Sequence, residues 1–92
     1  MNCVVLTDKA RKDLRKIPVH IFRKFEFWAK QVTIEGISKV RRIPGFHDEP
    51  LKGQRRGQRS IRLSQAYRAI YRVLPGHQVE LIQVEEITKH EY

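Results

Sequence analysis

The residue types best suited to chemistry lie in the middle of the chain and at its carboxyl end. Glu49 stands in a loop rich in cations, Arg68 lies in an apolar, strand-like segment, and the chain finishes with His90, Glu91 and Tyr92. A carboxylate can accept a proton, a guanidinium can stabilise developing negative charge, and an imidazole can donate a proton near neutral pH. This set of side chains suits proton transfer around a phosphodiester.

The distribution of charge predicts a polyanionic partner, and together with the candidate chemistry it points to RNA. The 92 residues include 19 Lys and Arg against 10 Asp and Glu, a formal net charge of +9. Residues 39–72 hold 10 basic and 2 acidic residues, whereas residues 79–92 hold 1 basic and 4 acidic residues. An anionic membrane surface or an acidic protein would also fit this charge, and any single exposed arginine is explained as a solvated surface residue. The predicted RNA-binding set is His47, Lys52, Arg55, Arg56, Arg59 and Arg62.

The carboxylates and the final histidine also have plain structural explanations. Asp48 and Glu49 are the only acids across the long central loop and the two strand patterns after it. A carboxylate there either balances nearby charge or acts as a general base, and the sequence leaves both roles open. His90 and Tyr92 either form a frayed tail or place a proton donor beside a phenol.

Several functional classes find no support in the composition. No two of the four histidines have the spacing of a metal site, so we predict no metal and no cofactor. No apolar run reaches the roughly 18 residues of a membrane span, and the first residues lack a signal-peptide pattern. The single cysteine, Cys3, cannot form an internal disulfide. We expect a buried, unreactive thiol in a cytoplasmic protein with no membrane partner.

Hydrophobic periodicity predicts one α+β domain over residues 1–92, in the order β-α-α-β-β-β. A helical hairpin spans residues 8–34, with Pro18 opening the second helix and Gly36 ending it. Three hairpin-linked strands follow, the last of them alternating regularly through residues 79–87. With the first strand they form an antiparallel sheet covered on one face by the helices. The predicted strands are residues 3–6, 59–63, 66–73 and 79–87, the predicted loop is 37–58, and the apolar stripe of the second helix is Ile21, Phe25, Trp28 and Val32.

Three segments of the central basic region resemble the RelE/ParE superfamily of bacterial toxins from type II toxin–antitoxin systems. They are EPLKG at residues 49–53, SIRL at 60–63 and YRAIY at 67–71. The order of predicted elements is similar to that of the superfamily over nearly the whole chain. Within it, the segments are most similar to the mRNA interferases of the HigB, YoeB, YafQ and RelE types. The chain departs from the YoeB type by ending His-Glu-Tyr where that type ends His-Tyr.

The resemblance implies a RelE-like fold and a ribosome-dependent endoribonuclease, which cleaves mRNA by metal-independent 2′-hydroxyl attack and so inhibits translation. It implies that Glu49 is the general base, that Arg68 stabilises the scissile phosphate, and that His90 is the acid. Tyr92 would orient the phosphate or a base. The implied partners are a cognate antitoxin, mRNA and the ribosomal RNA, with a heterotetramer containing an antitoxin dimer as one assembly open to the pair.

Two other functions share these sequence features. A ParE-like inhibitor of DNA gyrase would use the same scaffold without catalysis, so Glu49 and His90 would be dispensable. A non-catalytic nucleic-acid-binding domain would bind with steep salt dependence and would cleave nothing. The three functions therefore differ first in whether Glu49 is needed.

Overall fold

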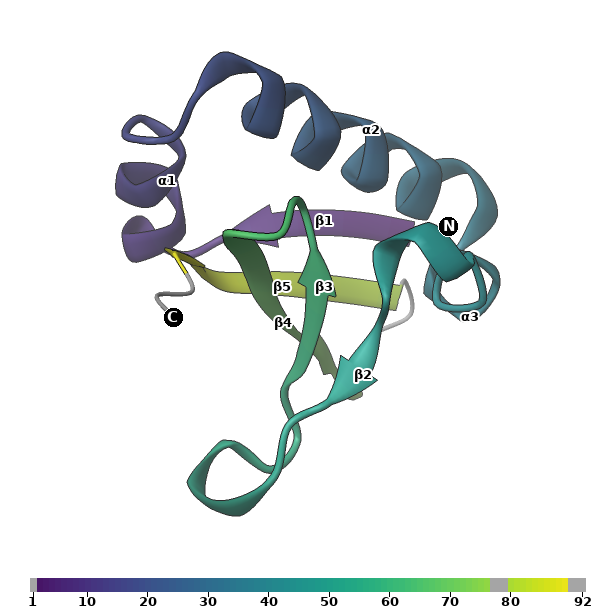
Figure 1. Ribbon diagram of the computed structural model, residues 1–92. Helices are drawn as coiled ribbons and strands as arrows, with labels where there is room; N and C mark the ends of the chain where they lie inside the picture. Colours follow the sequence, from purple (N-terminus) through teal and green to yellow (C-terminus); the bar gives the residue numbers. More distant parts are fainter. Residues whose placement is uncertain (1, 77–79, 90–92) are drawn as a thin grey trace.

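Three helices and a five-stranded sheet make up the described part of the chain (Figure 1). The structure is a computed structural model that describes residues 2–76 and 80–89. Its helices are α1 (Asp8–Leu14), α2 (Val19–Glu35) and α3 (Ile37–Val40), with short 3-10 turns at Pro44–Phe46 and Gly53–Arg55. Its strands are β1 (Asn2–Leu6), β2 (Glu49–Pro50), β3 (Arg59–Arg62), β4 (Tyr67–Leu74) and β5 (Glu80–Lys89). None of these helices is long and apolar enough to cross a membrane.

The α+β class and the covering of one sheet face by helices are confirmed. The strand order is β1-β5-β4-β3-β2; α2 runs across β1, and α1 stands at the end of the sheet against β5 (Figure 1). The sheet is mixed rather than antiparallel throughout, because β1 lies parallel to β5. Periodicity reports which side chains are buried, but it does not report the direction of a strand relative to its neighbour. Two further elements, α3 and β2, lie within residues 37–58, for which periodicity predicts only a loop.

Capping residues set the ends of the helices, as predicted for Pro18 and Gly36. Pro18 precedes α2, and Gly36 ends it with a φ of 87°, a backbone conformation that favours glycine. At α1, the Thr7 hydroxyl accepts a hydrogen bond from the Ala10 amide (3.0 Å) and donates one to the Glu85 carbonyl (2.6 Å). Thr7 therefore caps α1 and also fastens it to β5.

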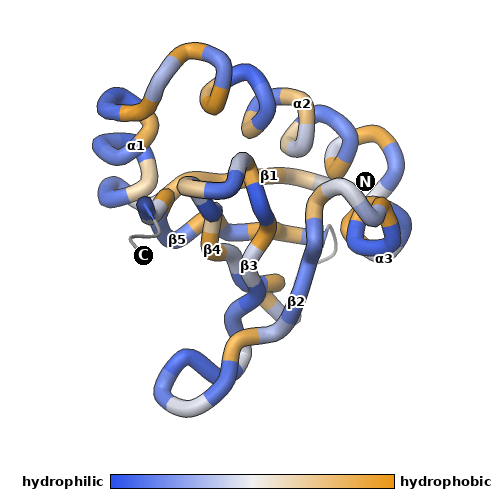
Figure 2. The backbone as a smooth tube through the Cα atoms, in the orientation of Figure 1, coloured by the Kyte–Doolittle hydropathy of each residue, from blue (hydrophilic) through white to orange (hydrophobic). Residues whose placement is uncertain are grey.

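The predicted apolar stripe of α2 faces the sheet and forms much of the core. Its four residues are each at most 4% exposed. The ring centroid of Trp28 lies 5.4 Å from that of Tyr71 on β4, so the middle of the helix packs directly on the middle of the sheet. Figure 2 shows apolar residues recurring along α2 and the strands, whereas hydrophilic residues dominate the loop between β2 and β3.

The prediction that Cys3 is a buried thiol is wrong. Its neighbours Val4 and Leu6 pack against the core, so alternation along β1 turns Cys3 to the opposite face, where it is exposed. A short apolar run does not show by itself which of its alternate side chains are buried.

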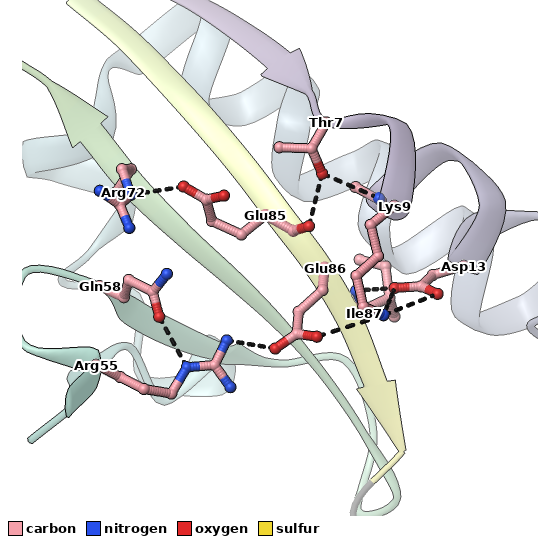
Figure 3. A network of polar contacts seen from close by, with 10 residues as sticks. Thr7, Lys9, Asp13, Arg55, Gln58, Arg72, Glu85, Glu86 and Ile87 are labelled. Carbon is pink, nitrogen blue, oxygen red and sulfur yellow. Dashed lines mark hydrogen bonds and ion pairs between the residues drawn. The ribbon is translucent and has the colours of Figure 1, made fainter. Parts of the chain in front are cut away.

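β5 contains a β-bulge, which contradicts the regular alternation predicted for residues 79–87. Tyr71 pairs with Val84, but the next pair is Ile70 with Glu86, so Glu85 has no partner on β4. The extra residue places Glu85 and Glu86 on the same side of β5 although they are consecutive, each turned toward an arginine (Figure 3). Two adjacent polar residues in an otherwise alternating strand are the sequence signal of this bulge.

Candidate active site

The face of the sheet that the helices leave uncovered carries the main candidate residues, and we call it the open face. On β3, Ile61 is part of the core, so Ser60 and Arg62 on either side of it belong to the open face. The same alternation applies on β4, where Ala69 and Tyr71 are core residues. The candidate residues on the open face are Glu49, Ser60, Arg62, Arg68 and Arg72, from three adjacent strands. Glu85 and Glu86 of β5 lie on the same face, where Glu85 forms an ion pair with Arg72.

Arg68 contacts two other residues of the open face. Its Nη1 donates hydrogen bonds to Glu49 Oε1 and to Ser60 Oγ, each at 3.2 Å. The Arg68 side chain is 24% exposed, whereas Glu49 is 59% exposed and Ser60 is buried. The buried hydroxyl therefore helps to hold the guanidinium in place while the carboxylate beside it stays accessible to solvent. This arrangement presents a fixed cation next to a proton acceptor.

A second arginine faces Arg68 across the strand pair. Arg62 and Arg68 are register partners on β3 and β4, so their side chains leave the same face side by side. Like charges in such positions repel one another. Glu49 is ion-paired with Arg68, and Arg62 has no ion pair or side-chain hydrogen bond within the described residues. The open face therefore carries uncompensated positive charge suited to an anion such as a phosphate.

Among the loop cations, Arg55 is already paired. Its guanidinium forms an ion pair with Glu86, which also lies 3.4 Å from Lys9 of α1 (Figure 3). The hydrogen bond from Arg55 is the main cause that lowers the pKa of Glu86, against the opposing effect of burial. Lys52 and Arg56 are exposed and form no ion pair within the described residues.

Arg59 is directed away from the open face, to the helix side of the sheet. Its Nε lies 2.5 Å from Oδ1 of Asp48, a carboxylate whose side chain is only 1% exposed. The other Asp48 oxygen accepts a hydrogen bond from the Tyr71 hydroxyl. Burial lowers the pKa of Arg59, but the hydrogen bond and charge of Asp48 outweigh it, so the pKa is raised overall. Burial, reinforced by Asp48, likewise raises the pKa of Tyr71.

Comparison with known proteins identifies the family. The family model for the ParE toxin of type II toxin–antitoxin (parDE) systems matches residues 4–87. The chain belongs to this toxin family. The resemblance to the RelE/ParE superfamily is thereby confirmed. No curated protein sequence matches the toxin significantly.

Solved structures agree with the fold of the toxin. A YoeB/ParE toxin from Agrobacterium tumefaciens superposes with a TM-score of 0.72 at 22% identity, covering 97% of this chain and 99% of that one. The toxin–antitoxin complex RelBE2 from Mycobacterium tuberculosis gives 0.69 at 24% identity, with 96% of each chain covered. YafQ from E. coli gives 0.73 at 14% identity, covering 98% of this chain and 94% of that one. At these identities the likeness establishes the shared fold.

Of the toxin's two histidine candidates, only His47 belongs to the described residues. His47 is exposed and follows a 3-10 turn with a φ of 45°, so its backbone helps to turn the chain toward β2. His90 and Tyr92 lie outside the described residues. The last described residue of β5, Lys89, pairs with Tyr67, which precedes Arg68 on β4. Within residues 2–76 and 80–89, no three His, Cys, Asp or Glu side chains are grouped as metal ligands would be.

Sequence reasoning did not separate Asp48 from its neighbour Glu49. The two adjacent acids point to opposite faces of the sheet, one buried among Arg59 and Tyr71 and the other exposed beside Arg68. Asp48 directly precedes β2, so alternation along an extended chain would have predicted this separation, but the two residues of β2 are too few for a strand pattern to be recognised.

Proposed function

We propose that the toxin is an endoribonuclease that cleaves mRNA on the ribosome and thereby inhibits translation. The observation that carries the proposal is the geometry of the open face, where Glu49 lies 3.2 Å from Arg68 and Arg62 stands opposite. A proton acceptor beside fixed cations is what internal cleavage of an RNA strand requires.

In this mechanism, Glu49 removes the proton from a 2′-hydroxyl group, and that oxygen attacks the adjacent phosphorus. The bond from phosphorus to the 5′-oxygen then breaks, which leaves a 2′,3′-cyclic phosphate and a 5′-oxygen that takes up a proton. Arg68 and Arg62 stabilise the additional negative charge on the phosphorane. We assign the leaving-group proton to His90 and orientation of the phosphate or a base to Tyr92, on the basis of the sequence motif.

The loop cations contribute unequally to RNA binding in this proposal. Lys52 and Arg56 are exposed and available to the RNA backbone. Arg55 must exchange its contact with Glu86 before it can bind a phosphate. Arg59 stabilises the sheet rather than binding the RNA in this proposal, because it forms an ion pair with the buried Asp48.

We also propose a cognate antitoxin as the protein partner of the toxin. Membership of a type II toxin family and the likeness to the toxin chain of RelBE2, a toxin–antitoxin complex, support this partner. A net charge of +9 fits an acidic antitoxin segment, and a heterotetramer with an antitoxin dimer is the proposed assembly. Messenger RNA and ribosomal RNA as the other partners imply a cytoplasmic location.

Inhibition of DNA gyrase is the second candidate, and the family assignment favours it because the matching family is that of ParE toxins. Such a toxin acts by binding a protein, so it has no need for a proton acceptor. The accessible carboxylate of Glu49 beside Arg68 favours the ribonuclease.

Glu49→Gln tests the proposal, because the amide keeps the shape of the side chain but cannot accept the proton. We expect mRNA cleavage, measured by primer extension on a translated message, to fall by about 100-fold or more while RNA binding is retained. Glu26→Gln, which neutralises an exposed glutamate on α2, is the matched control and should cleave normally. Undiminished growth arrest by Glu49→Gln, with intact mRNA and broken DNA, would instead establish the gyrase mechanism.

A further inference from the structure

The adjacent acids Asp48 and Glu49 lie on opposite faces of the sheet. The Asp48 carboxylate is 1% exposed and is held by Arg59 at 2.5 Å and by the Tyr71 hydroxyl. The Glu49 carboxylate is 59% exposed, and among the described residues its polar contact is the one of 3.2 Å with Arg68. One residue is therefore firmly fixed inside the protein while the next extends into solvent.

The backbone around Glu49 has few restraints of its own. β2 contains two residues at the edge of the sheet, and one of them, Pro50, has no amide hydrogen to donate. The backbone hydrogen bond that follows runs from the Leu51 amide to the Gln58 carbonyl (2.9 Å). Before the strand, His47 adopts a left-handed backbone with a φ of 45°, a conformation that is unfavourable for residues other than glycine. The backbone conformation of residues 47–51 must therefore be stabilised by side-chain contacts nearby.

Asp48 supplies those contacts and connects them to the centre of the core. Tyr71 is 0% exposed, and its ring packs 5.4 Å from that of Trp28. Because burial and Asp48 both raise its pKa, Tyr71 remains a hydrogen-bond donor throughout the physiological pH range. Arg59 pairs with Pro50 in the strand register, so it holds Asp48 from the strand next to β2.

We propose that Asp48 is a positioning residue, which acts with Tyr71 and Arg59 to hold Glu49 at the distance from Arg68 that proton abstraction requires. The inference rests on the proposed function for its catalytic part. In this proposal the three residues act through Glu49 and not by contact with the RNA. The geometric part, that the buried group holds β2 in place, stands without any assumption about the reaction.

Tyr71→Phe tests this role because it removes one hydroxyl and leaves the aromatic packing intact. We expect kcat for mRNA cleavage to fall by about 10- to 100-fold with KM unchanged, as a misplaced catalytic group would cause. In the Glu49→Gln background the same change should cost nothing further, since no base remains to be positioned. Tyr67→Phe is the matched control, because Tyr67 lies on the same strand and makes no side-chain hydrogen bond within the described residues.

Hydrogen exchange of the Leu51 amide separates this inference from the proposed function. Exchange should accelerate in Tyr71→Phe and stay unchanged in Tyr67→Phe, whatever the toxin does to RNA. A wild-type toxin that cuts no mRNA but shows this pattern refutes the ribonuclease and the catalytic part of the inference, and supports the geometric part, that the buried group holds β2 in place. Unchanged exchange refutes the positioning role, and so does an equal loss of cleavage in the wild-type and Glu49→Gln backgrounds, which would mark a general structural defect.

Discussion

Replacing Arg62 with glutamine tests whether the repulsion between Arg62 and Arg68 lowers the stability of the protein while their charges favour the binding of an anion. Arg62 stands directly opposite Arg68 and has no ion pair or side-chain hydrogen bond within the described residues. Opposed like charges of this kind destabilise a sheet by roughly 0.2–1 kcal/mol. The substitution removes the repulsion and breaks no described polar contact, so we expect the free energy of unfolding to rise by about that amount.

Thermal unfolding measures the gain in stability in Arg62→Gln, and RNA binding measures the expected loss of affinity. For a domain of this size, 1 kcal/mol shifts the melting temperature by about 4–8 °C, so we expect a rise of about 1–8 °C in Arg62→Gln. The rise should shrink at high salt, because screening already weakens the repulsion. RNA affinity should fall, and the slope of its logarithm against the logarithm of salt concentration should decrease by about 1.

Arg42→Gln is the control for stability, because it removes the same charge from an exposed position outside the strands. Its melting temperature should stay close to that of the wild type. A lower melting temperature in Arg62→Gln would refute the reasoning, since Arg62 would then have a stabilising contact. A raised melting temperature with unchanged RNA affinity and salt slope would show that the opposed arginines do not serve RNA binding.

Two further predictions concern the remaining charged groups. Arg68→Ala removes the cation beside Glu49, and we expect a loss of roughly 100- to 1,000-fold in the rate of mRNA cleavage, measured by primer extension; a loss below tenfold would exclude Arg68 from the charge-stabilising role. Glu86 has a lowered pKa, so its contribution to stability is complete above its usual value of 4.5 and is lost as pH falls through the lower folded value. Urea unfolding of wild type and Glu86→Gln at pH 7 and at pH 3 should therefore differ more at pH 7, and an equal difference at both values would contradict the cause assigned to the shift.

Much of the fold follows from the sequence because burial imposes periodicity. The stripe of α2 ending at Gly36 and the alternation in β3 and β4 predict which faces meet in the core. The parallel pairing of β1 with β5 does not follow, since both directions of pairing bury the same side chains. The exposure of Cys3 does not follow either, because both alternate faces of its short run are apolar.

Sequence patterns indicate a candidate residue where a charged side chain interrupts an apolar strand. Arg68 is identifiable as a guanidinium in an apolar strand, and its contact with Glu49 agrees with the pairing of the two in one site. The separation of Asp48 from Glu49 needed the strand β2, which is too short to leave a periodic signal. Their different environments are set by residues from β3 and β4 that are distant in sequence, such as Tyr71.

The bulge in β5 has a consequence for how the length of this strand can vary. Because Tyr71 pairs with Val84 and Ile70 with Glu86, Glu85 is the one extra residue of β5 in its pairing with β4. Deletion of Glu85 would join its neighbours and leave the other pairs of the ladder in register, whereas a deletion elsewhere in the strand would turn the following side chains to the wrong face. Insertions and deletions between related toxins should therefore accumulate at this point of the strand, and an alignment of the family should place its gap there.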